Sequence, residues 1–207
     1  RVVTCGITGD ATLRGYKKIA FREVSVVTGS IRPAAELSVS VNIENLDIIG
    51  STNCDLHIEV ALDGNICAQA TQKDVLLTSG YNYIKSALTI ENPHLWWPAG
   101  YGAQPLYTVR IYAECEGIAE AWPTFQYGIR TLSLDTSLID KENRHFTFIV
   151  NDTPIFAKGG DWIPNDSIYA RTTDEKVQAL LDEAINANFN CIRIWGGGLY
   201  ETDYFYA

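Results

Sequence analysis

Four side chains near the ends of two expected strands are suited to binding a sugar. Asp161 and Trp162 lie in the segment KGGDWIP (158–164), and Arg193 and Trp195 lie in RIWGGG (193–198). Arginine supplies several hydrogen-bond donors, aspartate accepts hydrogen bonds, and tryptophan presents a flat apolar face. Because sugars carry both hydroxyl groups and apolar C–H faces, these residues predict a carbohydrate partner. The alternative is structural: a core tryptophan, a paired arginine and a tight glycine turn.

The chain does not offer the two carboxyl groups that hydrolysis of a glycosidic bond requires. Glu201 and Asp203 follow the glycines, but we interpret them as residues at the start of a helix, where negative charge is favourable. The glycines have neither the lysine of a phosphate-binding loop nor the spacing of a dinucleotide-binding turn. A Gly-x-Ser-x-Gly elbow is also missing from the sequence. We therefore expect no catalytic residue on this chain.

Metal and cofactor sites are not predicted either. The three histidines stand apart from one another and from the cysteines. The five cysteines, which show no C-x-x-C spacing, are Cys5, Cys54, Cys67, Cys115 and Cys191. We interpret them as small buried apolar side chains with free thiols. The alternative for two of them is a Cys54–Cys67 pair across the turn at residues 63–65.

Two adjacent tryptophans form a second candidate feature. Trp96 and Trp97 stand between prolines in NPHLWWP (92–98), outside any periodic strand. They would either stack on a sugar or form a contact between domains. We favour the contact.

Short strands fill the first two thirds of the chain. Apolar residues alternate at 36–45, 56–62 and 107–113, which is the two-residue period of half-buried strands. Weaker segments at 19–27, 84–90 and 125–129 bring the expected number to about seven strands. This count and spacing predict an immunoglobulin-like β-sandwich at residues 17–131.

After residue 131 the pattern changes. A hairpin is expected to turn at residues 151–152, and Thr172 with Glu175 predicts a capping box. One apolar helix stripe at 177–185 follows, and residues 191–195 then predict a strand that ends at the glycines. Strand, helix and strand in this order form a βαβ unit with parallel strands. A closed (β/α)₈ barrel needs about 250 residues, so residues 132–207 are expected to form the start of an incomplete barrel.

Strand alternation places the candidate residues within such a barrel. Arg193 and Trp195 share one face of their strand with Cys191. The face toward the helices is apolar, so Arg193 and Trp195 are expected to point inward near the carboxyl end of the strand. Barrel enzymes place their active sites at that end. Asp161 and Trp162 occupy the matching end of the neighbouring strand.

Composition limits the class of partner. The 207 residues are 46% hydrophobic and 20% charged, which is typical of a globular domain and not of a disordered chain. Apolar runs fall short of the roughly 18 residues that a membrane-spanning helix needs, so no membrane partner is expected. The 25 acidic residues exceed the 16 basic ones, which argues against a nucleic-acid partner.

Three segments together resemble glycoside hydrolase family 2, and most closely its β-mannosidase-like branch. The segment at 92–107 resembles part of the family's central immunoglobulin-like domain, and FQYGIR (125–130) resembles the stretch that leads into its barrel. KGGDWIP (158–164) and RIWGGG (193–198) resemble the first two barrel strands, and this last pair points to mannosidases. Residues 1–16 resemble the final strand of the family's sugar-binding jelly-roll domain.

The resemblance implies a fragment of a retaining, exo-acting β-mannosidase-like enzyme that hydrolyses terminal β-linked sugars. It implies that Trp195 and Arg193 line the sugar pocket, with Asp161 and Trp162 nearby. The two catalytic glutamates of the family lie on later barrel strands, so this chain alone is expected to be inactive. Implied partners are the carbohydrate substrate and the remaining domains of the same polypeptide, with no cofactor.

Two alternatives stay open on the sequence. One is another activity of the family, such as β-galactosidase or exo-glucosaminidase. The other is a non-catalytic carbohydrate-binding or structural β-sandwich module that uses the tryptophan-rich segment. The sequence leaves the compartment open among periplasmic or secreted, lysosomal and cytoplasmic.

Overall fold

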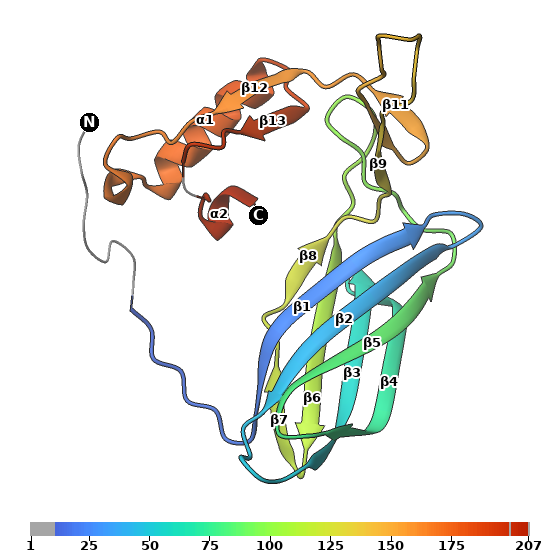
Figure 1. The fold of residues 1–207 in the computed structure, drawn as a ribbon, viewed down its shortest axis with the longest axis vertical. Helices are drawn as coiled ribbons and strands as arrows, with labels where there is room; N and C mark the ends of the chain where they lie inside the picture. The colour runs from blue at the N-terminus through green and yellow to red at the C-terminus, as the bar shows by residue number, and fades with distance from the viewer. Residues whose placement is uncertain (1–10, 199, 207) are drawn as a thin grey trace. The chain divides into compact units, whose positions relative to one another are not determined.

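A computed structural model of the chain describes residues 11–198 and 200–206, and it is mainly β with few helices (Figure 1). The described chain divides into two compact units. The sandwich unit comprises Gly15–Trp97 and Ala103–Pro154, and the parallel unit contains residues 98–102 together with the described residues from 155 onward. Most of the jelly-roll strand expected at residues 1–16 lies outside the described residues, and residues 11–16 form no regular element.

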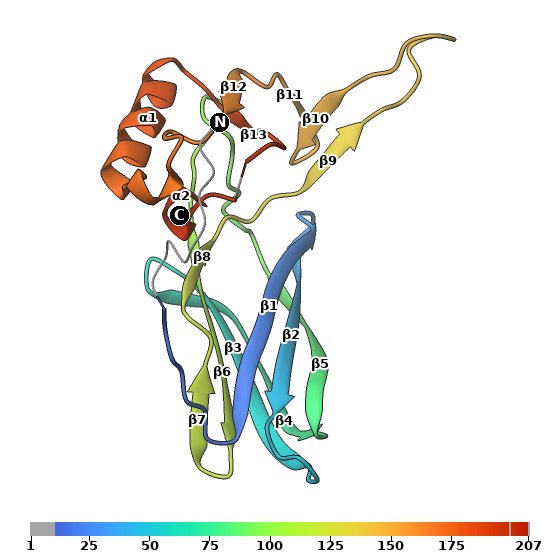
Figure 2. The same ribbon diagram turned by 60° about the vertical axis from the view of Figure 1, so that its left-hand side comes forward.

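Two sheets form the core of the sandwich unit, which also includes most of a smaller three-stranded sheet described below. One has the strand order β1-β2-β5 and the other β4-β3-β6-β7, with β8 paired to β6. Figure 1 and Figure 2 show these sheets as separate layers. The strands of the two sheets are β1 (Ile19–Ser30), β2 (Ala35–Asn45), β3 (Thr52–Leu62), β4 (Asn65–Leu77), β5 (Gly80–Ile90), β6 (Tyr107–Cys115), β7 (Ile118–Ala121) and β8 (Phe125–Tyr127).

Alternation of apolar residues builds the core between the sheets. In β2 every second residue from Leu37 to Ile43 is buried, and the residues between them face outward or pack on neighbouring side chains. Strands β3 and β6 follow the same period and lie side by side in antiparallel register. Completely covered side chains in this core include Leu37, Val39, Ile43, Leu56, Ile58, Val60, Tyr107, Val109 and Ile111. The sequence prediction of a sandwich from these strands is confirmed.

Strand β4 was not expected from the sequence. Its inward positions carry the small residues Ala68 and Ala70, and only Leu77 of the whole strand is buried. As the edge strand of its sheet it packs on one side only, so it lacks the strong apolar alternation of β2 and β3. Strand β7 is short and equally exposed, and it was missed for the same reason.

A disulfide joins the two central strands of the larger sheet. Cys54 of β3 and Cys115 of β6 are bonded, with their Cα atoms 4.4 Å apart. The expectation of free thiols is therefore wrong for this pair, and the alternative Cys54–Cys67 bridge is also wrong. Cys67 is exposed and Cys191 half-buried, and neither has a disulfide partner among the described residues. Cys5 lies outside the described part of the chain.

The Asn151 side chain joins three segments at the end of the sandwich unit by hydrogen bonds. It lies in the turn between β10 (Thr147–Val150) and β11 (Thr153–Ile155), where the sequence predicted a hairpin. Its side-chain oxygen accepts a hydrogen bond from the Thr131 amide at 3.0 Å, and its side-chain nitrogen donates to the Trp96 carbonyl at 3.0 Å. Asn151 is 1% exposed and has a φ of 49°, which asparagine tolerates better than most residues.

Strand β10 also pairs with β9 (Leu132–Asp135), so the three strands form a sheet in the order β11-β10-β9. Strands β9 and β10 pair in antiparallel register and run side by side in Figure 2. The exposed segment between them, residues 136–146, contains an isolated bridge between Leu138 and Arg144.

The parallel unit contains one βαβ motif. Strands β12 (Gly159–Trp162) and β13 (Cys191–Ile194) are parallel neighbours, and helix α1 (Asp174–Asn186) lies between them in the chain. A short 3₁₀ helix, η1 (Tyr169–Arg171), precedes α1, and helix α2 (Asp203–Tyr206) follows the glycines. Gly159 is required at the strand pair, because a Cβ there would collide with the Cys191 carbonyl.

The predicted helix begins one residue later than expected. Thr173, and not Thr172, is the N-cap of α1, since its side chain accepts a hydrogen bond from the Lys176 amide. Thr172 instead donates its hydroxyl to Asn165 at 2.7 Å. Because two threonines stand side by side, the sequence pattern did not distinguish which one is free to cap. The helix ends as predicted, with Asn188 in the left-handed conformation that follows many helices.

Candidate functional site

Asp161 and Arg193 form a charged pair at the carboxyl ends of the two parallel strands. They are direct register partners, and the Arg193 guanidinium lies 2.8 Å from the Asp161 carboxylate. Their side chains are 53% and 68% exposed, and an ion pair this exposed stabilises a fold by less than about 1 kcal/mol. Both groups therefore keep hydrogen-bonding capacity for a ligand.

A shallow pocket of about 240 Å³ lies on this face of the strands. Its lining includes Asp161, Arg193, Cys191 and the two glycines of β12. The charged pair supplies hydrogen-bond donors and acceptors on this face. This face can bind a hydroxyl-rich molecule.

Trp162 faces the other side of the same strand pair. It is 8% exposed, its ring centroid lies 4.8 Å from that of Phe205, and its indole Nε1 donates a hydrogen bond to Glu201 at 2.9 Å. A second pocket of about 450 Å³ on this side is lined by Trp162 and by residues of α1 such as Leu180 and Ala184. The structure thus brings Asp161 and Arg193 together and places Trp162 on the opposite face, as alternation along a strand requires.

Trp195 follows β13 and lies against the glycines. Its amide donates a hydrogen bond to the Trp162 carbonyl at 3.1 Å, and its side chain is 38% exposed. A Cβ on Gly198 would lie 2.6 Å from the Trp195 Nε1 and 3.1 Å from the Pro164 Cγ. A Cβ on Gly197 would be crowded, since the ring lies 3.2 Å from that position. The indole ring thus lies on both glycines, and it excludes a Cβ most strongly at Gly198.

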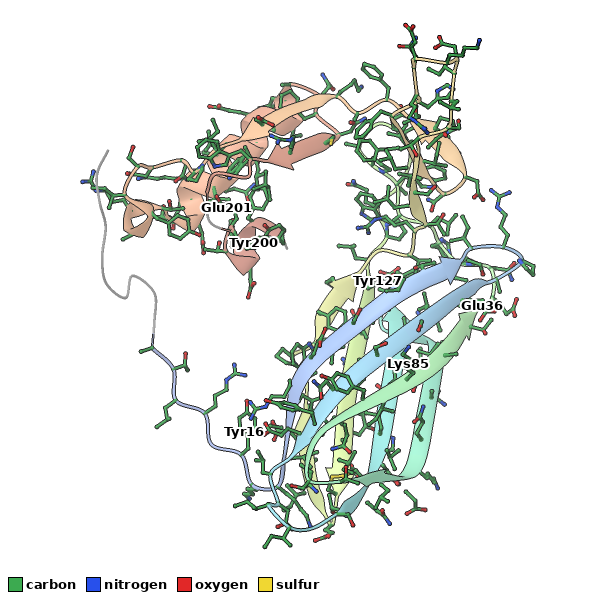
Figure 3. All side chains as sticks on the ribbon, viewed as in Figure 1. Tyr16, Glu36, Lys85, Tyr127, Tyr200 and Glu201 are labelled. Carbon is green, nitrogen blue, oxygen red and sulfur yellow. A yellow bond between two sulfur atoms is a disulfide. The ribbon has the colours of Figure 1, made fainter. Side chains whose placement is uncertain are left out.

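Glu201 is the residue that sequence reasoning missed. It was interpreted as a helix-start residue, but its side chain is buried, with 8% exposure, next to Trp162. Figure 3 labels Glu201 beside its neighbour Tyr200, which is 90% exposed. Burial, as the larger cause, and the negative charge of Glu201 raise the pKa of Tyr169. The sequence held no signal for this role, because a carboxylate before a helix is commonly a solvent-exposed cap residue.

Trp96 packs inside the sandwich unit. The Arg130 guanidinium lies over its ring at 4.5 Å, and its amide donates to the Ile129 carbonyl at 2.9 Å. A Cβ on Gly128 would lie 2.8 Å from the ring, so the glycine makes room for it. Together with the bond from Asn151, these contacts lie within the sandwich unit, so the contact between domains stays a prediction.

Within residues 11–198 and 200–206, no three His, Cys, Asp or Glu side chains come together as metal ligands. In the same part of the chain, no helix has the length and apolar character needed to cross a membrane.

Comparison with known proteins assigns the family. The model of "Glycosyl hydrolases family 2" matches residues 20–130, more than half of the chain. A β-mannosidase B of Emericella nidulans is 34% identical over 99% of this chain and 24% of its own length. The β-mannosidase of Rattus norvegicus is 38% identical over 60% of this chain and 14% of its own. The chain spans a quarter or less of the length of these relatives.

Solved structures agree with this assignment. A β-D-mannosidase from Dictyoglomus thermophilum matches with a TM-score of 0.85 and 34% identity, over 93% of this chain and 23% of that protein. An exo-chitosanase from Amycolatopsis orientalis matches with a TM-score of 0.70 over 91% of this chain and 21% of its own. At 21% identity it supports the fold alone. The sandwich, the strand-end residues and these relatives lead to one conclusion: the chain belongs to glycosyl hydrolases family 2 and is β-mannosidase-like.

Proposed function

We propose that this chain is part of a retaining, exo-acting β-mannosidase that removes terminal β-linked sugars from carbohydrate chains. The observation that carries the proposal is the likeness to the Dictyoglomus thermophilum β-D-mannosidase, at 34% identity and a TM-score of 0.85. The match to the Emericella nidulans β-mannosidase B covers 99% of the chain, so it spans the segments that carry the four candidate sugar-binding residues.

The proposed domain organisation has three parts. Residues 1–16 are the end of a sugar-binding jelly-roll domain, 17–131 are an immunoglobulin-like sandwich, and 132–207 begin a (β/α)₈ barrel. The parallel pairing of β12 and β13 around α1 supports the barrel assignment, because barrels are built from such units. The far greater length of the relatives leaves room for the other strands and helices.

In this proposal the sugar pocket lies at the carboxyl ends of β12 and β13. Arg193 and Asp161 bind hydroxyl groups, and the exposed part of the Trp195 ring packs on the apolar face of the sugar. Trp162 belongs to the pocket through its backbone, which holds Trp195. The short distance between the two charged groups supports a joint role in binding one ligand.

The chemistry itself requires residues outside this sequence. A retaining glycosidase uses one carboxylate as the nucleophile at the anomeric carbon and a carboxylic acid that protonates the leaving oxygen, with the two groups about 5–5.5 Å apart. In the 207 residues, Asp161 pairs with Arg193 and Glu201 is bound to Trp162, so neither is matched to such a partner. The role of this chain in the reaction is therefore to bind and orient the sugar.

The test uses the full-length protein and p-nitrophenyl β-D-mannopyranoside. We expect hydrolysis with retention, seen by NMR as β-mannose formed first, and no turnover by the 207-residue chain alone. Replacement Trp195→Ala should raise KM by about tenfold or more, because an aromatic contact contributes roughly 0.5–1.5 kcal/mol beyond its buried area. The exposed-loop variant Arg144→Ala is the control.

Preferential cleavage of the corresponding β-D-galactoside or β-D-glucosaminide would overturn the assignment to mannosides. Absence of hydrolysis of all three substrates would overturn the enzymatic proposal. In that case, binding of mannose by the 207-residue chain would indicate a binding module.

A further inference from the structure

The parallel unit contains a buried carboxylate that the proposed binding site does not use. Glu201 is 8% exposed, and its Oε1 accepts the indole N–H of Trp162 at 2.9 Å. A carboxylate is seldom buried without a specific partner, because burial removes it from water. The partner here lies 39 residues earlier in the chain, at the end of β12.

Trp162 forms hydrogen bonds on both sides of the glycine turn. Its carbonyl accepts the Trp195 amide at 3.1 Å, just before Gly196–Gly198, and its indole donates to Glu201, just after them. Its ring also packs against Phe205 of α2 at a tilted angle of 52°. One residue of β12 thus holds the segment that leaves β13 at two points.

The position of the Trp195 ring depends on the same turn. The ring lies on Gly197 and Gly198 and close to Pro164, which follows Trp162 by two residues. If the Glu201 end of the turn were released, Gly197 and Gly198 would no longer be fixed beneath the ring. The ring would then lose the surface that orients it.

We infer that Glu201 is a positioning residue, whose bond to Trp162 fixes the glycine turn and thereby orients the Trp195 ring. The inference rests on the proposed function only in that Trp195, Arg193 and Asp161 are taken to bind the sugar. Glu201 itself does not touch the sugar. A substitution at Glu201 therefore acts through the Trp195 ring.

The experiment is an NMR comparison of the ¹⁵N-labelled 207-residue chain with Glu201→Ala and Glu201→Gln. Two signals are measured: the solvent exchange of the Trp162 indole N–H, and the ring-current shifts that the Trp195 ring causes in the α-protons of Gly197 and Gly198. The variants Trp162→Phe and Trp195→Phe assign the resonances. Glu142→Ala, at an exposed glutamate in the segment 136–146, is the control.

In Glu201→Ala we expect the Trp162 indole N–H to exchange roughly tenfold faster or more, because a buried donor loses its acceptor. The ring-current shifts of both glycines should collapse toward random-coil values. In Glu201→Gln both signals should stay near those of the wild type, since the amide oxygen still accepts the bond. The control Glu142→Ala should change neither signal.

Unchanged glycine shifts in Glu201→Ala would overturn the inference, even with faster exchange of the Trp162 indole. If Glu201→Ala does not fold, Trp162→Phe decides, because it removes the donor and keeps an aromatic ring. Retained glycine shifts in Trp162→Phe would then overturn the inference.

A titration with D-mannose separates this result from the proposed function. Mannose that shifts the Trp195 and Arg193 resonances in the wild type and in Glu201→Gln, with at least about tenfold weaker binding in Glu201→Ala, supports both. If mannose does not bind the wild type, the sugar pocket fails on this chain. The glycine shifts still decide whether Glu201 orients Trp195.

Discussion

Replacement of Asn151 by alanine tests how strongly one buried side chain holds the end of the sandwich unit. The substitution removes the acceptor of the Thr131 amide and the donor to the Trp96 carbonyl, both bonded at 3.0 Å. Leaving a buried partner unsatisfied costs about 1–3 kcal/mol. Alanine at a φ of 49° adds roughly 1 kcal/mol, because its Cβ crowds the backbone in the left-handed region. With two such partners and the strain together, we expect Asn151→Ala to lower the free energy of unfolding by about 3–7 kcal/mol.

Urea unfolding followed by tryptophan fluorescence measures this loss of stability. Two further variants separate the contribution of the hydrogen bonds from that of the backbone strain. Asn151→Gly keeps the backbone conformation without strain, so it should lose only the hydrogen-bond part and be about 1 kcal/mol more stable than Asn151→Ala. Asn151→Asp keeps the acceptor for Thr131 and loses the donor to Trp96, so its stability should fall between that of the wild type and Asn151→Gly. A loss below about 1 kcal/mol in Asn151→Ala would refute the reasoning.

Three other changes have expected outcomes. Gly159→Ala should separate β12 from β13 and cost about 1–3 kcal/mol of stability by overpacking, whereas Gly196→Ala, with open space around its Cβ position, should be neutral in the same thermal melts. Reduction of the Cys54–Cys115 disulfide, which closes a loop of 61 residues, should lower stability by about 2–4 kcal/mol, and an unchanged denaturation midpoint after verified reduction would contradict this. The pKa of Glu116 is lowered by hydrogen bonds from its partner Lys18, the larger cause, and from Thr52. The Glu116 carboxylate therefore stabilises the fold above its unfolded-state pKa, and this stabilisation is lost as the pH falls through the folded-state pKa. Glu116→Gln should therefore flatten the acid side of the stability profile measured by urea midpoints between about pH 3 and 7, and an unaltered slope would argue against the pair.

The sequence predicted the strands whose period is set by burial. Val39, Ile58 and Val109 alternate with outward residues because they face the opposite sheet, so their pattern carries the architecture directly. Strand β4 was not predicted, because the small side chains of Ala68 and Ala70 fill the core only partly at the edge of the sheet and give weak apolar alternation. The hairpin turn at Asn151 was predicted correctly, since its conformation is set locally.

The candidate site likewise contains one pairing that the sequence could predict and contacts that it could not. Asp161 and Arg193 could be placed together because parallel strands in register bring equivalent ends to one point. The bond between Trp162 and Glu201 could not be predicted, because it joins residues far apart in sequence and depends on the path of the glycine turn. The Cys54–Cys115 pairing was missed for a related reason: it requires the exact register of β3 against β6.

The adjacent residues Asp161 and Trp162 face opposite sides of the strand pair, and this limits how the gene can change there. Deleting or inserting a single codon within β12 would exchange the two faces, turning the indole toward the pocket and the carboxylate toward α1. The charged pair and the buried bond to Glu201 would be lost in one step. Length variation among relatives is therefore expected to avoid this strand and to accumulate in exposed segments such as residues 136–146.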